Sequence, residues 1–344
     1  MLTQNLSRIL SGKTVLVTGG AGTIGSEICR QLLEWKPARI VCLGRREEEL
    51  IAAREELRGR AAGVELATEV CDVRDRDRLA SVFSTHRPAI VFHAAAVKDI
   101  RDAADHPAEA VMVNVQGTAN VVDMALAHGG EMLLFVSSIK ALRPLSVMGA
   151  TKRLGEMIVA AAAARAGKAF FTVRLNNIYE SSGGVHAIFR RQIESGGPVT
   201  VTHPHAERTF VSAAEAARLL LEALSLDTQG SVLALAAGEK TNIAKLAQRL
   251  ISAHGQQAGN EVEIEYSGVR RGERLVEHVT LDGTQWLPTP HEHILVCGLD
   301  GPAAPAGGLE HSIRKLVLIA QGGDSNAVLG QLPKTVPDYS TDTP

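Results

Sequence analysis

The sequence predicts an α/β fold in which a doubly wound parallel sheet is joined to a smaller C-terminal cap. Three observations support this prediction. An apolar strand at 14–18 leads into spaced glycines, strand-like and helix-like segments alternate through the first half, and this alternation weakens in the second half. Strands and helices that alternate in this way build parallel sheets with helices on both faces.

The first unit of the chain has the pattern of a phosphate-binding turn. Thr14–Thr18 is a short apolar strand, and glycines follow it before a helix with apolar residues at Ile24, Ile28 and Leu32. Such glycines let the backbone approach a pyrophosphate, whose charge the helix N-terminus holds. A glycine-rich turn without a nucleotide is the weaker alternative, because both flanking elements are present. The pattern predicts a Rossmann-type site whose cofactor-binding residues are Gly19, Gly22, Thr23, Ile24 and Gly25.

The residues after the second predicted strand, Arg39–Leu43, indicate which cofactor binds. An NAD site usually has Asp or Glu at this place to accept hydrogen bonds from the ribose. This chain has Gly44, Arg45 and Arg46 instead. Because a guanidinium pairs well with phosphate, we expect NADP to be favoured over NAD, with Arg45 as the contact. The alternative is that both arginines are solvated residues at the start of a Glu-rich helix.

Two later strand ends are predicted to complete the cofactor site. Asp72 and Val73 follow a strand at 64–70, and Asp72 either contacts the adenine or caps a helix. Ala94 and Ala95 lie near the end of a strand at 89–96, where small side chains let a cofactor come close. The same periodicity predicts helices at 47–60, 76–85 and 107–128 and a strand at 132–136.

The second half of the sequence predicts a cap and a tail. We expect residues 1–178 to form the dinucleotide-binding domain, with returning pieces around 209–240. Residues 179–320 are expected to form mainly the substrate-binding cap. The Pro and Gly content of 301–308 and the polar sequence of 321–344 predict a loosely held tail.

Composition argues against several classes of function. The chain has 344 residues, 45% of them hydrophobic, and its 36 Lys and Arg nearly balance its 38 Asp and Glu. This balance does not indicate nucleic-acid binding. Because no apolar run is long enough for a signal peptide or a membrane helix, we expect a cytoplasmic protein without membrane contact. The cysteines and histidines lack metal-ligand spacing, so no metal site is predicted.

A second informative stretch lies at 136–153. Ser138 and Lys140 come just after a strand end, and Lys152 follows Met148 by one helical turn, so both point the same way. On these residues, and on the runs 17–25, 93–98, 147–152, 197–204 and 268–274, the chain resembles the extended short-chain dehydrogenase/reductases. The resemblance is strongest to the nucleotide-sugar 4,6-dehydratases of the capsule and flagellin-glycan type.

This resemblance implies a reaction and a substrate. Such enzymes oxidise C4 of a hexose, remove the proton at C5, expel the C6 hydroxyl and return the hydride. The cofactor is regenerated in every turnover, so it is expected to be tightly bound and recycled. The expected substrate is a nucleotide sugar or a nucleoside. The alanine-rich helix 152–166 is expected to support a homo-oligomer.

The resemblance also implies roles for single residues. Lys152 is expected to hold the nicotinamide ribose and to lower the pKa of the hydroxyl being oxidised. Lys140 is expected to remove the C5 proton as a neutral amine. Burial and the nearby Lys152 are expected to lower the pKa of Lys140 and so to favour this neutral form. Ser138 is expected to hydrogen-bond the substrate at the oxidised carbon. The positions expected to hold substrate are Lys98, Asn177, Arg208, Arg270 and Glu273.

Two residues depart from the family pattern. Met148 stands where a catalytic tyrosine is usual, as in some dehydratases of this subgroup, and Ile139 replaces the acid expected to protonate the departing hydroxyl. Tyr179, Glu180 and His186 are candidates for a relocated acid, and Glu180 and His186 are also expected substrate contacts. The alternatives are an epimerase or oxidoreductase that acts through a keto intermediate, and a non-catalytic dinucleotide-sensing protein.

Overall fold

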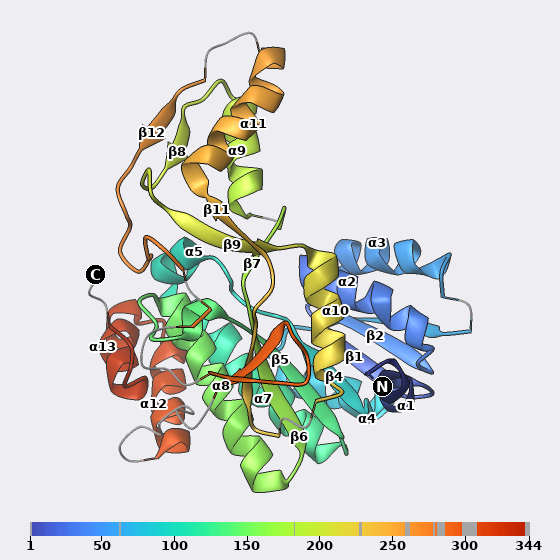
Figure 1. Ribbon diagram of the computed structural model, residues 1–344. Coiled ribbons are helices and arrows are strands. Elements are labelled where there is room, and N and C mark those ends of the chain that lie inside the picture. The colour runs from blue at the N-terminus through green and yellow to red at the C-terminus, as the bar shows by residue number, and fades with distance from the viewer. Residues whose placement is uncertain are drawn as a thin grey trace.

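The structure is a computed structural model, shown in Figure 1. It describes residues 2–61, 63–181, 183–226, 229–258, 262–277, 279–280, 286–297 and 308–340. A large sheet with helices on both faces carries a smaller lobe at the top of the view. Within the ranges above, no helix combines the length and the apolar character needed to cross a bilayer.

A central sheet organises the molecule, and the part of the chain that the structure describes contributes nine strands to it. Seven strands run parallel in the order β3-β2-β1-β4-β5-β6-β10. Beyond β10, β14 pairs antiparallel with β10, and β13 pairs antiparallel with β14. This order confirms the predicted doubly wound α/β fold. The strand order reverses between β1 and β4, which are themselves parallel. The strands are β1 (Thr14–Thr18), β2 (Arg39–Gly44), β3 (Glu65–Val70), β4 (Ile90–His93), β5 (Met132–Ser138), β6 (Ala169–Leu175), β10 (Val232–Leu235), β13 (Trp286–Pro288) and β14 (Ile294–Cys297).

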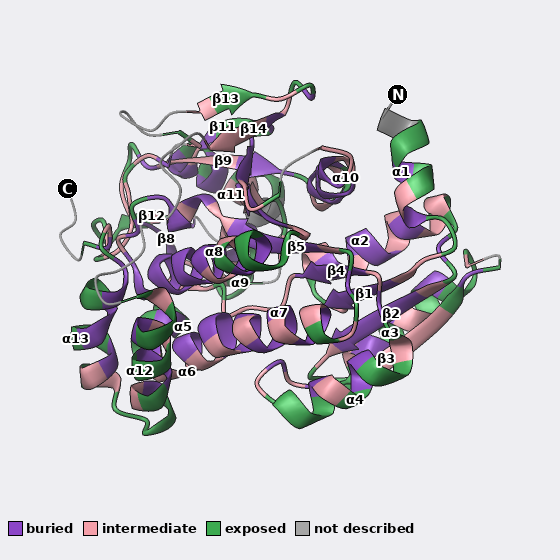
Figure 2. Cartoon of the chain, turned by 90° about the horizontal axis from the view of Figure 1, so that it is seen from below, coloured by how far each residue is buried: buried purple, intermediate pink, exposed green. Residues whose placement is uncertain are grey.

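Neighbouring residues of each strand pack on opposite faces of this sheet. Val15 and Val17 belong to one buried cluster, whereas Leu16 between them belongs to another. Because both faces are covered, the central strands read as continuous apolar runs, and Figure 2 shows β1 and β4 as mostly buried, whereas the edge strands β3 and β13 are largely intermediate or exposed. One face is covered by α1 (Leu2–Leu10), α2 (Thr23–Leu32), α3 (Glu47–Arg58) and α10 (Ala213–Ala223), and the other by α4 (Arg76–His86), α7 (Gly117–Ala127) and α8 (Val147–Ala166).

The helix predicted at 107–128 is not regular. After the short α5 (Ile100–Asp105), it consists of α6 (Pro107–Val111), a π-helical segment (Met112–Gln116) and α7. Asn114 lies in the π-helical segment, which lets its side chain reach the backbone that follows β4. Its Oδ1 accepts from the Val97 N–H at 2.8 Å, and its Nδ2 donates to the Val97 carbonyl at 2.9 Å. This contact fixes the chain next to Lys98, in keeping with the occurrence of π segments at functional sites.

The smaller lobe is the cap. Its elements are β7 (Asn177–Ile178), α9 (Val185–Glu194), β8 (Val199–Val201), β9 (Glu207–Val211), β11 (Glu239–Asn242), α11 (Ile243–Ala258) and β12 (Ile264–Tyr266). Strands β11, β9 and β7 form one small sheet, and β12 pairs with β8 in a second. The cap has a core of its own, to which Phe189, Val199 and Leu246 contribute. In Figure 1 it stands above the carboxyl ends of the central strands.

The C-terminal part differs from the sequence-based expectation. We expected residues 321–344 to be loosely held, but α12 (Leu309–Gln321) and α13 (Ser325–Thr335) pack beside α6 and α8. Val328 and Leu332 repeat at the spacing of one helical turn, and both are fully buried in that contact. The end of this segment also reaches the loop before α8, since the Ser340 N–H donates to the Pro144 carbonyl at 3.1 Å. Residues 341–344 lie outside the described residues.

Candidate active site

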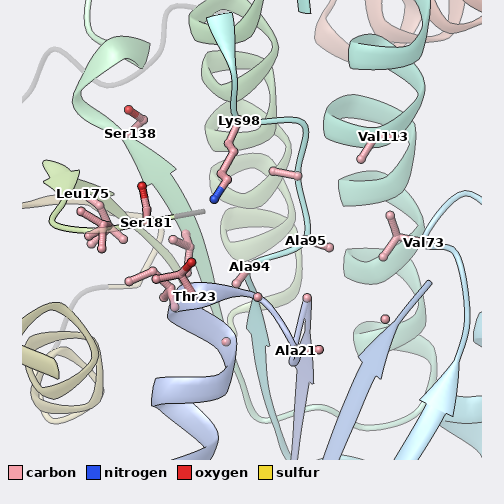
Figure 3. Close-up of a pocket in the computed structure, with 18 of the residues that line it drawn as sticks. Ala21, Thr23, Val73, Ala94, Ala95, Lys98, Val113, Ser138, Leu175 and Ser181 are labelled. Carbon is pink, nitrogen blue, oxygen red and sulfur yellow. The ribbon is translucent and has the colours of Figure 1, made fainter. Parts of the chain in front are cut away.

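A cavity of about 390 Å³ lies at the carboxyl ends of β1, β4, β5 and β6, where the strand order reverses. Open α/β sheets bind their ligands at this place. Figure 3 shows the cavity with Thr23 of the glycine-rich turn on one side and Ser138 on another, and with Lys98 pointing in between them. The predicted cofactor-binding and catalytic residues that line it are Gly19, Gly22, Thr23, Ile24, Gly25, Arg45, Asp72, Val73, Ala94, Ala95, Ser138, Lys140, Met148 and Lys152.

The glycine-rich turn is packed too tightly for side chains. Gly19 has φ of +67°, and a Cβ there would lie 2.9 Å from the Ala95 nitrogen. A Cβ on Gly25 would lie only 2.1 Å from the Gly19 carbonyl oxygen. Gly22 is the N-cap of α2 and offers no side-chain cap, so the first N–H groups of the helix stay available to an anion. The backbone here is therefore shaped to approach a pyrophosphate.

Charged side chains surround the end of the cavity near β2 and β3. Arg45 Nη1 lies 4.0 Å from Asp72 Oδ2 and 3.7 Å from Glu109 Oε1. Arg74, which sequence reasoning missed, donates to both of the same carboxylates at 2.7 Å. Burial alone would raise the pKa of Asp72, but the hydrogen bonds from Arg74 lower it below its usual value. The helix N-cap proposed as the alternative role of Asp72 belongs to Asp75, whose side chain accepts from the Arg78 N–H.

Helix α8 carries Met148 and Lys152 into the cavity. Ser146 begins this helix by accepting from the Gly149 N–H at 3.1 Å. Lys152 Nζ donates to the Val136 carbonyl at 2.8 Å and lies 4.7 Å from the centre of the Phe135 ring. Burial lowers the pKa of Lys152 to about 7, because a charged ammonium is costly away from water.

Lys140 lies in the 3₁₀ turn Ile139–Ala141 that directly follows β5. Its Nζ donates to Asn177 Oδ1 at 2.8 Å and lies 3.0 Å from Glu277 Oε1 and 3.2 Å from Glu277 Oε2. Sequence reasoning did not identify Glu277. Burial alone would raise the pKa of this carboxyl, but the positive charges of Lys140 and Arg208 lower it below its usual value. The sequence offered one signal for Glu277: it lies three residues beyond 268–274, one of the runs on which the family resemblance rests.

The other predicted substrate residues fall into two groups. Lys98 and Asn177 line the cavity, and burial lowers the pKa of Lys98. Arg208 lies on the cap strand β9, and Arg270 and Glu273 lie in the segment after β12. None of the three is among the described residues that line the cavity. Arg208 links this group to the site, because its Nε lies 3.3 Å from Glu277 and its Nη2 lies 3.9 Å from Glu273.

The candidates for a relocated acid also lie outside the lining formed by the described residues. The Tyr179 ring is tilted by 48° against the His186 ring with 3.9 Å between the ring centres, and Glu180 is exposed and 3.4 Å from Arg190. Ile139 is buried, so its side chain is enclosed by protein. An acidic group next to Lys140 is instead supplied by Glu277, from a distant part of the chain.

Comparison with known proteins identifies the family. A family model described as "Polysaccharide biosynthesis protein" matches residues 15–298. The chain belongs to this family of extended short-chain dehydrogenase/reductases.

The chain is 41% identical to the "Probable polysaccharide biosynthesis protein EpsC" of Bacillus subtilis and 40% identical to the "Capsular polysaccharide biosynthesis protein CapD" of Staphylococcus aureus. Each match covers 80% of this chain but 46% of the relative, so the chain spans about half the length of these relatives. Among solved structures, Pen from Bacillus thuringiensis is 28% identical with a TM-score of 0.76, and the match covers 84% of this chain and 88% of Pen.

Proposed function

We propose that the protein is an NAD(P)-dependent dehydratase that acts on a nucleotide sugar or a nucleoside through a transient ketone. The observation that supports this most is that Lys140 and Lys152 line the same cavity as the glycine-rich turn. A protein that only sensed the dinucleotide would need neither lysine. The names of the relatives EpsC and CapD place them in polysaccharide biosynthesis, which favours a sugar as the group that is dehydrated.

Each side chain then has a separate task. The bound nicotinamide would supply the hydride acceptor and, later in the turnover, the hydride donor. Lys152 would hold the nicotinamide ribose and favour loss of the proton from the hydroxyl being oxidised. Ser138 would hydrogen-bond the oxygen at the oxidised carbon. Lys140 would take the proton from the neighbouring carbon, which the new carbonyl group makes acidic.

The buried Ile139 favours a second candidate function, which is also an enzyme activity on a nucleotide sugar. An isoleucine cannot donate a proton to a departing hydroxyl, so a keto-sugar formed in this cavity could be reprotonated at carbon instead. That reaction would make the protein a nucleotide-sugar epimerase. It would use Lys140 and Lys152 as before, without loss of water.

Mass spectrometry tests these functions directly. The protein with NAD or NADP is incubated with a panel of nucleotide sugars and nucleosides, with heat-denatured protein as the control. A dehydratase is expected to form a product lighter by about 18 mass units, the mass of water. An epimer has the mass of its substrate, so the products are also separated by liquid chromatography and their configuration is read by NMR. A product of unchanged mass but altered sugar configuration would identify the epimerase. Cofactor binding without any product across the panel would identify the sensing protein.

We also propose that NADP is modestly favoured over NAD. A 2′-phosphate near Arg45 would gain a charge-assisted pair, but the carboxylates of Asp72 and Glu109 already face that guanidinium. Attraction and repulsion therefore oppose each other at this end of the cavity, and Arg74 further balances the two carboxylates. This balance is the reason to expect a preference rather than an absolute choice.

The Arg45→Asp variant is expected to reverse this preference. A carboxylate at this place would accept hydrogen bonds from the ribose hydroxyls and repel a 2′-phosphate, so the ratio of the two affinities should change by about 10-fold or more. Titration calorimetry with NAD and NADP measures both affinities. Arg54→Asp, at a half-buried position of α3 outside the described lining of the cavity, is the matched control. An unchanged ratio in Arg45→Asp would remove Arg45 from cofactor selection.

A further inference from the structure

We propose that Glu277 orients Lys140 so that this one lysine serves as both the base and the acid of the elimination. The inference rests on the dehydratase function proposed above. The Glu277 side chain is only 6% exposed, and both of its oxygens approach Lys140 Nζ. It is not among the described residues that line the cavity, so it acts through Lys140 and is a positioning residue.

The argument starts from the geometry of the lysine nitrogen, which has four tetrahedral positions. The side-chain carbon occupies one position. Asn177 Oδ1 at 2.8 Å and the Glu277 carboxylate at 3.0 Å each accept one N–H, so together they occupy two further positions. Among the described residues, Nζ has these two hydrogen-bonding partners, so one position is left for a molecule in the cavity that Lys140 lines. That position holds a lone pair in the amine and an N–H in the ammonium, so the same point in space can accept or donate a proton.

Elimination can then proceed at this single position. The step starts from the neutral form of Lys140, once its ammonium has lost a proton. The amine lone pair takes the proton from C5, and the electrons of that C–H bond pass toward the carbonyl. When they form the carbon–carbon double bond, the bond between C6 and its oxygen breaks. The ammonium returns its proton to this oxygen, which leaves as water, and Lys140 is an amine again. No separate acid is required, which accounts for an isoleucine at position 139.

Glu277 is suited to this role because its charge is held in place. Asn177 Nδ2 donates to Glu277 Oε2 at 2.7 Å, and Arg208 Nε lies 3.3 Å from Oε1. A fixed carboxylate stabilises the positive charge that develops on Lys140 as the proton leaves carbon. Asn177 contacts both Lys140 and Glu277, so the three side chains form a closed triangle. The positions of all three are thereby coupled.

The test is the Glu277→Gln variant, which keeps the size of the side chain and removes its charge. We expect kcat for dehydration to fall by about 100-fold, while KM and cofactor affinity stay within about 3-fold of wild type. Glu239→Gln changes an exposed glutamate on the cap strand β11 and is expected to leave both parameters unchanged. A rise in KM with unchanged kcat, a loss of cofactor affinity, or full kcat in Glu277→Gln would overturn the proposal.

A second substrate tests the acid role. With fluorine in place of the C6 hydroxyl, the leaving group departs as fluoride and needs little protonation. The loss of kcat in Glu277→Gln is therefore expected to be at least about 10-fold smaller for the fluorinated substrate. Equal losses would mean that Glu277 supports the base function alone and that another group is the acid. If wild-type protein dehydrates no substrate, the proposed function itself fails, and this outcome is distinct from a fully active Glu277→Gln.

Discussion

Replacing Lys140 with alanine is expected to stop dehydration while hydride transfer continues at least in part. In the proposed mechanism, oxidation depends on the cofactor and on Lys152, which lies on a different element, whereas elimination depends on an amine that reaches the C5 proton. A general base contributes roughly 100- to 10,000-fold, so the dehydration rate should fall by that factor. With substrate present, the variant should accumulate reduced cofactor, which absorbance in the near ultraviolet measures.

Two controls make this result specific. Lys245→Ala removes an exposed lysine from helix α11 of the cap and should leave dehydration unchanged. Cofactor affinity of Lys140→Ala is measured in parallel, because a lost cofactor would explain inactivity by itself. Full dehydration activity in Lys140→Ala would exclude this residue from the chemistry.

The Gly25→Ala variant is expected to abolish cofactor binding. The added Cβ would lie 2.1 Å from the Gly19 carbonyl oxygen and 2.7 Å from the Gly19 carbonyl carbon, both of which are backbone atoms. Neither can move without displacing the turn, so the affinity for NAD(P) should fall by about 100-fold or more, as misplaced backbone N–H groups lose the pyrophosphate. Titration calorimetry gives the affinity, and thermal unfolding shows whether the sheet still forms.

The matched control uses a glycine with free space around it. A Cβ on Gly59, just after helix α3, would meet nothing within 4 Å. Gly59→Ala should therefore keep cofactor affinity and unfold at the same or a slightly higher temperature, because alanine reduces the freedom of the unfolded chain. Wild-type affinity in Gly25→Ala would show that the turn relaxes more easily than its packing implies.

Much of the fold could be predicted because its signals are local. The strand, glycines and helix of 14–33 are adjacent in sequence, and their order alone indicates a parallel sheet with a ligand at its carboxyl edge. Lys140 and Lys152 were assigned to this edge for the same reason: each comes at a fixed distance from a strand end or a helix start. Both lysines line the cavity, although their roles remain proposals.

The features that were missed depend on contacts between distant residues. Lys140 and Glu277 are 137 positions apart, and no periodicity in the sequence links them. Arg74 was missed because its pairing with Glu109 depends on how α6 packs beside the turn after β3. The expectation of a loose tail failed because α13 has a largely polar sequence with a few apolar residues on one face. That face is stable only where α6 and α8 already provide a surface for it.

The contact between Ser340 and Pro144 has a consequence for the order in which the protein is completed. A chain emerges from the ribosome with its N-terminus first, so the loop before α8 is made long before the segment that braces it. The sheet can form early, but the loop that leads into α8, the helix that carries Met148 and Lys152 into the cavity, must wait for late-synthesised helices to dock. Contacts so distant in sequence are slow to form, so we expect cofactor capture to lag behind formation of the sheet during synthesis.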